Sequence, residues 1–197
     1  MYINNIDFID YRISDSEYME FKKNGRLPNG MLAPFKQLPV LEIDGKIIAQ
    51  TSAIARYCGK ISGMYPTNNN FESAQIDQII DAAQDINFAV TLSGKDKDPI
   101  KKKLAREKLS QIHLPKWFQF LEDLLIENKN SKWFVGSSMT IADLAIWRLI
   151  GWLKSGLLEG VPTSIVDPYK NLVMMRDEIY KHPKIKEWMI IKYGKEI

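Results

Sequence analysis

The sequence predicts an α/β domain in the first third of the chain and an all-α domain in the rest. Residues 38–50 hold two short apolar segments around Asp44-Gly45, a pair that tolerates the backbone of a tight hairpin turn. From Phe71 onward, apolar residues recur at helical rather than strand spacing. An Asn-rich stretch typical of a linker separates the two parts. We therefore place the domains at residues 1–66 and 71–197.

The composition excludes several classes of protein. The chain has 197 residues, 45% hydrophobic and 26% charged, and its net charge of +3 is too small to indicate nucleic acid or membrane as a partner. Cys58 is the only cysteine, and His113 and His182 lack metal-ligand spacing, so no disulfide framework or metal site is expected. No apolar run approaches the roughly 18 residues of a membrane span, and no secretory segment opens the chain. We expect a cytoplasmic protein.

The stretch from residue 34 to residue 57 predicts strand, turn, strand and helix. Leu38–Ile43 is short and apolar, and Lys46–Gln50 makes the return strand. Thr51 and Ser52 are placed to cap the helix that follows. An ordinary hairpin, in which Asp-Gly only turns the chain and Thr51 only caps, would account for the same pattern.

Two features of this stretch indicate a ligand site. Pro39 stands at the start of a strand, where a cis peptide can turn the chain and leave the backbone of Leu38 free for an extended peptide ligand. Gln50 and Thr51 stand where a strand meets a helix N-terminus, which favours a carboxylate.

Taken in order, three motifs resemble the glutathione-binding half of cytosolic glutathione transferases, most closely those of the sigma class: Gln37-Leu38-Pro39-Val40-Leu41, Asp44-Gly45 and Gln50-Thr51-Ser52-Ala53-Ile54-Ala55-Arg56-Tyr57. The resemblance implies a thioredoxin-like first domain and glutathione as co-substrate. It implies that Leu38 pairs with the cysteinyl part of glutathione and that Gln50 and Thr51 hold its γ-glutamyl carboxylate. The resemblance also implies that Gln37 and Pro39 belong to the glutathione-binding residues.

Upstream of these motifs we expect a strand at Asp7–Arg12 and a helix at Asp15–Lys23. Tyr18 and Lys22 lie four residues apart, so they share a face of that helix. The resemblance implies that Tyr18 stands where the sigma class often has tryptophan, and Lys22 where a lysine reaches the glycyl carboxylate. A solvated helix with one half-buried aromatic is the alternative.

In relatives, a first strand and most of a first helix precede everything seen here, so we expect an incomplete thioredoxin-like domain. The resemblance puts the tyrosine that holds the glutathione sulfur as thiolate near the end of that strand, and we name no catalytic residue. Two explanations stay open. Either the chain is truncated or alternatively spliced, or the strand at Asp7–Arg12 moves over to pair with Leu38–Ile43.

The second domain contributes one predicted site residue. Asp85 lies on a helix predicted over Phe71–Val90, and the resemblance implies that it reaches across a homodimer to the glutathione α-amino group. A solvated acidic face is the alternative explanation. Some relatives bind a metal here, but Gln84 replaces one of the acids, so we expect no metal.

Two further segments of this domain stand out. The run KDKDPIKKKLAREK at residues 95–108 is the most basic of the chain, and it favours a solvated loop and helix start over a phosphate-binding patch. Thr140 and Asp143 predict a capping box that opens a buried central helix, with a role in folding.

These patterns lead to one function and one rival. We expect a homodimeric glutathione transferase that conjugates the thiol of glutathione to small electrophiles, whose identity the sequence does not specify. The rival is a non-catalytic relative with a structural or scaffolding role, which the missing tyrosine strand favours.

Overall fold

The computed structural model describes residues 1–129 and 131–194. The chain forms two compact units, Met1–Gly63 and Met64–Ile197, and each is described by itself. In the described part of the chain, no helix combines the length and apolar character needed to cross a bilayer.

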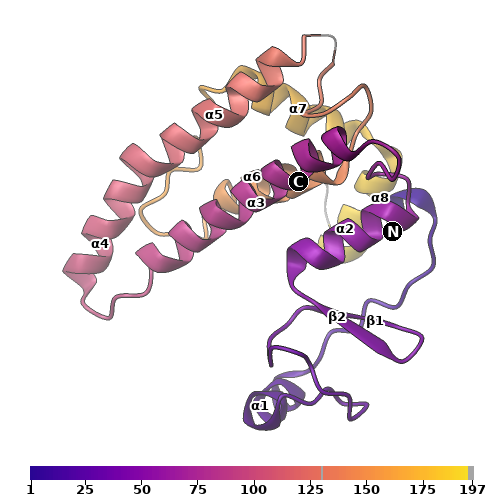
Figure 1. Cartoon of the computed structure of the whole chain (residues 1–197). Coiled ribbons are helices and arrows are strands. Elements are labelled where there is room, and N and C mark those ends of the chain that lie inside the picture. Colours follow the sequence, from indigo (N-terminus) through magenta and orange to yellow (C-terminus); the bar gives the residue numbers. More distant parts are fainter. Residues whose placement is uncertain (130, 195–197) are drawn as a thin grey trace. The chain divides into compact units, whose positions relative to one another are not determined.

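The first unit is built on a two-stranded antiparallel sheet (Figure 1). β1 (Val40–Ile43) pairs with β2 (Lys46–Ala49) so that Val40 lies opposite Ala49. Asp44 and Gly45 join them with φ values of 49° and 74°, the left-handed pair that a type I′ turn requires. The hairpin predicted from Asp-Gly is confirmed. Helix α2 (Thr51–Ile61) packs against both strands.

The start of this unit is a short 3-10 turn, η1 (Tyr2–Asn4), followed by helix α1 (Asp15–Asn24). Ser14 and Glu17 form a capping box that fixes where α1 begins. The helix ends at Gly25, whose φ of 75° suits glycine. Beyond it, the Ala33 N–H donates to the Gly25 carbonyl, so the loop after α1 doubles back on the end of the helix.

The strand expected at Asp7–Arg12 is wrong. In the described part of the chain this segment pairs with no strand, and β1 has β2 as its sole partner, so the shift toward Leu38–Ile43 is wrong as well. A strand exists only where a neighbour takes up its backbone N–H and C=O groups. Among the described residues no strand pairs with this segment, and Ile9 is 89% exposed. The segment remains irregular although its side chains alternate.

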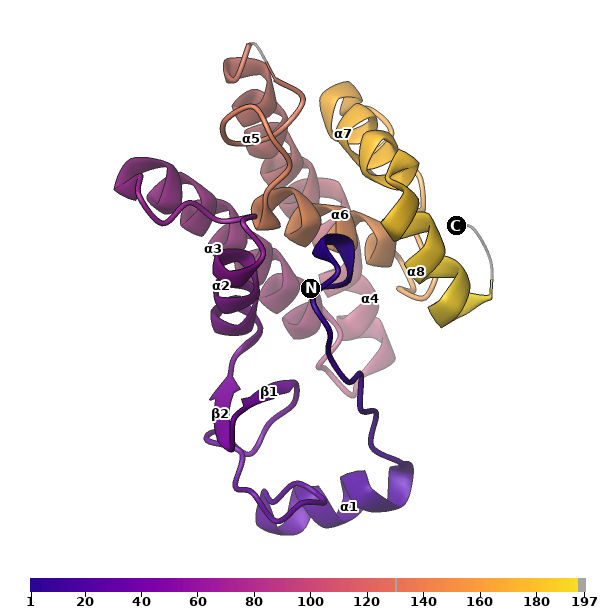
Figure 2. The same cartoon turned by 90° about the vertical axis from the view of Figure 1, so that its right-hand side faces the viewer.

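The second unit is all-α, as predicted (Figures 1 and 2). In chain order it contains α3 (Asn70–Ser93), α4 (Pro99–Lys108), the π-helical turn η2 (Leu109–His113), α5 (Leu114–Glu127), α6 (Ile141–Leu153), α7 (Lys170–Lys181) and α8 (Pro183–Tyr193). Helix α6 packs against α3 and α7, and α7 packs against α5 and α8. The core consists of the buried aliphatic and aromatic faces of these helices, for example Ile76, Ile86, Phe118, Ile146, Leu149, Ile150 and Met175.

The central helix α6 begins with the predicted capping box. The Thr140 N–H donates to Asp143 Oδ2 over 2.7 Å, and the Thr140 hydroxyl accepts from the Ala142 N–H over 3.2 Å. Asp143 Oδ1 also accepts from the Phe134 N–H over 2.9 Å, which ties the preceding loop to the helix. The box therefore fixes both the helix start and the approach of the chain.

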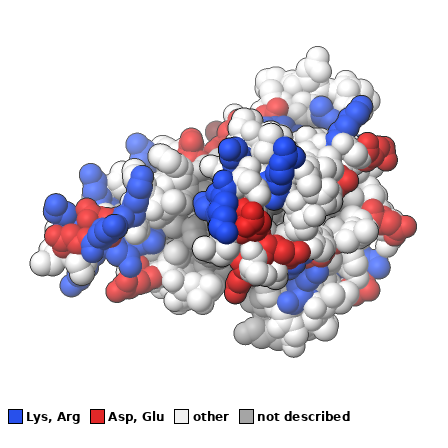
Figure 3. Space-filling model, turned by 90° about the horizontal axis from the view of Figure 1, so that it is seen from below, with Lys and Arg blue, Asp and Glu red and all other residues white. Residues whose placement is uncertain are grey.

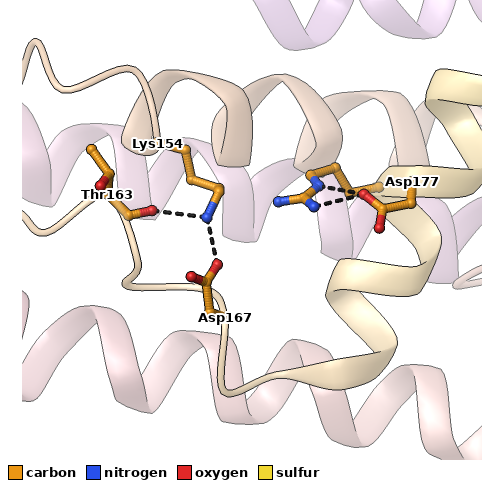
Figure 4. A network of polar contacts seen from close by, with 5 residues as sticks. Lys154, Thr163, Asp167 and Asp177 are labelled. Atoms are coloured by element: carbon orange, nitrogen blue, oxygen red, sulfur yellow. Dashed lines mark hydrogen bonds and ion pairs between the residues drawn. The ribbon is translucent and has the colours of Figure 1, made fainter.

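The irregular connection between α6 and α7 is held by polar contacts (Figure 4). Lys154, just after α6, donates to the Thr163 carbonyl over 2.9 Å and forms an ion pair with Asp167. Arg176 on α7 pairs with its neighbour Asp177 over 2.6 Å. The lysine thus ties the loop back to the helix that precedes it.

Candidate functional site

The hairpin register brings two of the predicted motifs to one place. Because Val40 lies opposite Ala49, the residues just beyond that pair, Pro39 and Gln50, lie at the same end of the hairpin. The Leu38-Pro39 peptide bond is cis, which the position of Pro39 at the start of a strand allows. Leu38 lies outside the β1–β2 ladder, and the residue is 38% exposed. The backbone that precedes β1 is therefore accessible to an extended ligand.

Gln50 has a backbone conformation that the sequence did not indicate. It is the N-cap of α2, with φ 73° and ψ 121°, and its side chain makes no capping hydrogen bond. The expectation that Thr51 and Ser52 cap this helix is wrong, because Thr51 is already its first helical residue. A non-glycine residue with positive φ is uncommon, and such residues cluster at functional sites. The N–H groups of the first turn thus lack a cap from the N-cap side chain.

The predicted residues at this end of the hairpin are open to solvent. Gln37, Leu38, Pro39, Gln50 and Thr51 all fall in the exposed class. The N-terminus of α2 carries the positive end of the helix dipole, so an anionic group of a ligand is favoured beside it. The site offers backbone groups, an amide and a hydroxyl, which suit a peptide with a carboxylate.

Tyr18 and Lys22 share a face of α1, as their spacing predicted. The Lys22 ammonium lies 6.0 Å from the centroid of the Tyr18 ring, and both residues are exposed. Tyr18 also stacks on the buried Phe21, with 6.4 Å between ring centroids. Among the described residues, no hydrogen bond or ion pair joins Tyr18 or Lys22 to the Gln50 end of the hairpin. Their assignment to a glutathione site stays a prediction.

Asp85 belongs to the second unit. It lies on α3 and is exposed, and no hydrogen bond or ion pair of its carboxylate is found among the described residues. Asp81, one helical turn earlier, is exposed as well. Residues 1–129 and 131–194 hold no group of three His, Cys, Asp or Glu side chains that could bind a metal ion. The role of Asp85 in a partner's site stays a prediction.

Cys58 is not suited to replace a sulfur-activating group or to act as a nucleophile. It lies on α2 and is half-buried, and this burial raises the pKa of its thiol. A thiol with a raised pKa is protonated at neutral pH, whereas the thiolate is the reactive form. This environment fits a packing role for Cys58.

Comparison with known proteins decides the family. Residues 6–60 match the family model described as glutathione S-transferase, N-terminal domain, and residues 84–190 match the model of the C-terminal domain. The chain belongs to the glutathione S-transferase family. It is 30% identical to hematopoietic prostaglandin D synthase of Gallus gallus, over 93% of this chain and 83% of that protein. It is 29% identical to glutathione S-transferase 2 of Manduca sexta, with the same coverage.

Solved structures agree with this assignment. A prostaglandin D synthase of Nilaparvata lugens superposes with a TM-score of 0.81 at 26% identity, covering 98% of this chain and 88% of that one. A glutathione S-transferase of the hookworm Necator americanus, described as monomeric, gives 0.77 at 28% identity, covering all of this chain and 90% of that one. The glutathione S-transferase chain therefore has a thioredoxin-like first domain and an all-helical second domain. Glutathione is the co-substrate of its family.

Proposed function

We propose that this glutathione S-transferase family member binds glutathione at the open end of its hairpin and conjugates the thiol to small electrophiles. One observation carries the proposal: the register of β1 and β2 brings Leu38-Pro39 and Gln50-Thr51 to the same end. Exposed backbone before β1 suits the peptide part of glutathione, and the N-terminus of α2 suits its γ-glutamyl carboxylate. Gln37 directly precedes Leu38 in the exposed segment before β1, so we include it in the same site.

The finer assignments belong to the same proposal. Tyr18 and Lys22 would contact the glycyl end of glutathione, and Asp85 of a second copy would contact its α-amino group. We place the protein in the sigma class, as a cytoplasmic homodimer. The prostaglandin D synthases among its relatives support the class, and the exposed carboxylate of Asp85 supports the dimer.

A second candidate is a binding protein without transferase activity. The sheet favours it, because its described part has two strands and the resemblance puts the thiol-activating tyrosine on another strand. Without such a group, the thiol of glutathione, with a pKa near 8.5, stays mostly protonated at neutral pH. The same hairpin end would then hold glutathione without activating it.

Two measurements on the same preparation separate the candidates. Calorimetric titration with glutathione measures binding, and conjugation of a generic aryl halide, followed by absorbance, measures catalysis. The transferase proposal expects binding and a rate above that of glutathione alone. Binding with a rate equal to the uncatalysed one supports the second candidate. If no heat of binding is detected, the hairpin end is not the glutathione site and both candidates fail.

A further inference from the structure

Helix α4 differs from the longer helices of the second unit in what it buries. None of its ten residues is buried, whereas α3, α5, α6 and α7 each bury an apolar face. Its two large aliphatic residues are turned outward, with Ile100 72% exposed and Leu104 60% exposed. They are four residues apart, so they lie on one face of the helix.

Lysines flank this aliphatic pair on both sides. At about 100° per residue, Lys101 and Lys108 follow Ile100 and Leu104 on one side of the helix. On the other side lie Glu107, next to Ile100, and then Lys103. All three lysines are exposed. Lys103 approaches Glu107 at 4.0 Å, and no ion pair of Lys101 or Lys108 is found within residues 1–129 and 131–194. We call these five residues, Ile100, Leu104, Lys101, Lys103 and Lys108, the outer face of α4.

Contacts on the opposite side of α4 fix the orientation of the outer face. Lys102 pairs with Glu159 over 3.2 Å. The Arg106 side chain fills the space beside Gly94 and Gly160, where an added Cβ would lie 2.5 Å and 3.0 Å from its nearest atom. These contacts anchor α4 to the end of α3 and to the loop after α6, so the helix cannot turn its aliphatic pair inward.

The net positive charge of the chain is concentrated around this helix. Residues 95–108 carry seven Lys or Arg and three Asp or Glu, a net charge of +4, while the whole chain carries +3. The rest of the sequence is therefore slightly acidic. Figure 3 shows basic side chains together with fewer acidic ones at its left, on the side where Figure 1 shows α4. The small net charge of the whole chain conceals this local excess.

We propose that the outer face of α4 docks on an anionic lipid surface. Ile100 and Leu104 would enter the boundary between headgroups and acyl chains, and the flanking lysines would reach lipid phosphates and carboxylates while their stems cover apolar surface. Docking of this kind is peripheral and needs no spanning helix. It departs from the sequence-based expectation of a solvated helix start and no membrane partner, and it does not depend on the proposed glutathione site.

Two other occupants fit the outer face less well. A second copy docked face to face would bring two segments of net charge +4 together, and like charges across an interface are unfavourable. Nucleic acid is bound through phosphate contacts and, in single strands, by stacking of bases on aromatic residues. Residues 95–113 contain no Phe, Tyr or Trp, and their exposed large apolar side chains, Ile100, Leu104 and Ile112, are all aliphatic. An anionic lipid surface offers negatively charged headgroups to the lysines and acyl chains to the aliphatic pair.

Sedimentation with vesicles tests the proposal. The full chain is mixed with vesicles of phosphatidylcholine alone, or of phosphatidylcholine and phosphatidylserine in equal parts. We expect binding to the second kind only, weakened by added salt. Lys101→Gln with Lys108→Gln should lower the partition coefficient by about thirtyfold, since each basic residue near an anionic surface contributes about 1 kcal/mol, a factor of about five. Lys129→Gln with Lys186→Gln, which removes two exposed lysines elsewhere, is the matched control.

A second pair of variants separates lipid from other anions. Ile100→Ser with Leu104→Ser keeps every charge, so it should weaken vesicle binding if the aliphatic pair enters the bilayer. Circular dichroism checks that each variant is folded. The proposal fails if anionic vesicles do not bind, or if the two lysine variants behave alike. It also fails if the serine variant binds vesicles as well as the parent, or if an oligonucleotide or inorganic phosphate displaces the vesicles completely, because the ligand is then a free anion or nucleic acid.

Discussion

Gln50 combines an uncommon backbone with a predicted ligand contact. Its φ of 73° costs free energy for a residue with a Cβ, on the order of 1–3 kcal/mol. Its side chain does not offset this free-energy cost by capping, because it makes no capping hydrogen bond to α2. The amide is exposed at the helix N-terminus instead, which is the position expected of a group that serves a ligand.

Replacing this amide should weaken glutathione binding without unfolding the protein. If Gln50 donates to the γ-glutamyl carboxylate, Gln50→Ala should cost roughly 1–3 kcal/mol, the range for a hydrogen bond to a charged group. Calorimetric titration of both proteins measures the difference. Gln119→Ala, an exposed glutamine on α5, is the control and should bind like the parent. Equal affinities of Gln50→Ala and the parent would remove Gln50 from the site.

Asp143 is the second residue whose environment sets a measurable property. Its side chain is fully buried, and burial raises the pKa of its carboxyl group from 3.8 to about 6, although hydrogen bonds from Phe134 and Thr140 lower it. The folded state therefore binds this proton more tightly than the unfolded chain. The stability that Asp143 contributes is greatest below about pH 4 and is lost as the pH rises through about 6.

The pH dependence of unfolding tests this sign. Asparagine at position 143 does not titrate, so the difference in unfolding free energy between the parent and Asp143→Asn isolates the carboxyl group. We expect this difference to shift against the parent by about 2 kcal/mol between pH 4 and pH 7. Urea unfolding at a series of pH values supplies both curves. Parallel curves, with no change in the difference, would show that the pKa of Asp143 is not raised.

At the scale of elements, helix α7 begins without a cap of its own. Its N-cap, Tyr169, makes no side-chain capping hydrogen bond. Glu122, which is 7% exposed on α5, accepts from the Asn171 N–H over 2.8 Å and from the Leu172 N–H over 2.9 Å. A carboxylate beside a helix N-terminus is favoured by the free N–H groups and by the dipole. One helix thus caps another.

Removing the charge of this cap should destabilise the fold. Glu122→Gln keeps the size of the side chain but replaces one acceptor with a donor, so we expect the unfolding free energy to fall by about 1–3 kcal/mol. Chemical unfolding followed by circular dichroism measures it. Glu127→Gln, on the exposed side of α5, should change stability by less than about 0.5 kcal/mol. A similar small change for Glu122→Gln would contradict the capping role.

The elements that the sequence predicted best are those whose boundary depends on nearby residues. Thr140 and Asp143 mark the start of α6, and Asp44-Gly45 marks the hairpin turn, because each pair acts over three residues or fewer. The segment Asp7–Arg12 has the alternation of a strand, but a strand depends on a distant partner. The left-handed backbone of Gln50 likewise has no local signal, since the residue is not glycine. We predicted the site residues from the family motifs, because the spacing of these residues in the sequence did not identify them by itself.

At the scale of the whole molecule, the main prediction is the homodimer. Asp85 is exposed on α3 without a hydrogen-bond partner among the described residues, and the family resemblance gives it a role only in the site of a second copy. Sedimentation velocity at micromolar concentration should therefore show a dimer. Because the hookworm glutathione S-transferase is described as monomeric, membership of the family does not by itself decide the oligomeric state. A clean monomer would remove Asp85 from the glutathione site and leave the first unit to bind alone.

The geometry of the π-helical turn η2 depends more on the number of residues in the turn than on which side chains they carry. In an α-helix, residues five apart differ by about 140° around the axis and lie on different faces. In η2 the Leu114 N–H donates to the Leu109 carbonyl, five residues back, and both leucines are buried. Loss of one residue from this turn would restore ordinary helix and rotate α4 by about 100° relative to α5. Ile100 and Leu104 would leave the outward side together. Evolution can therefore exchange side chains in this turn more easily than it can delete one.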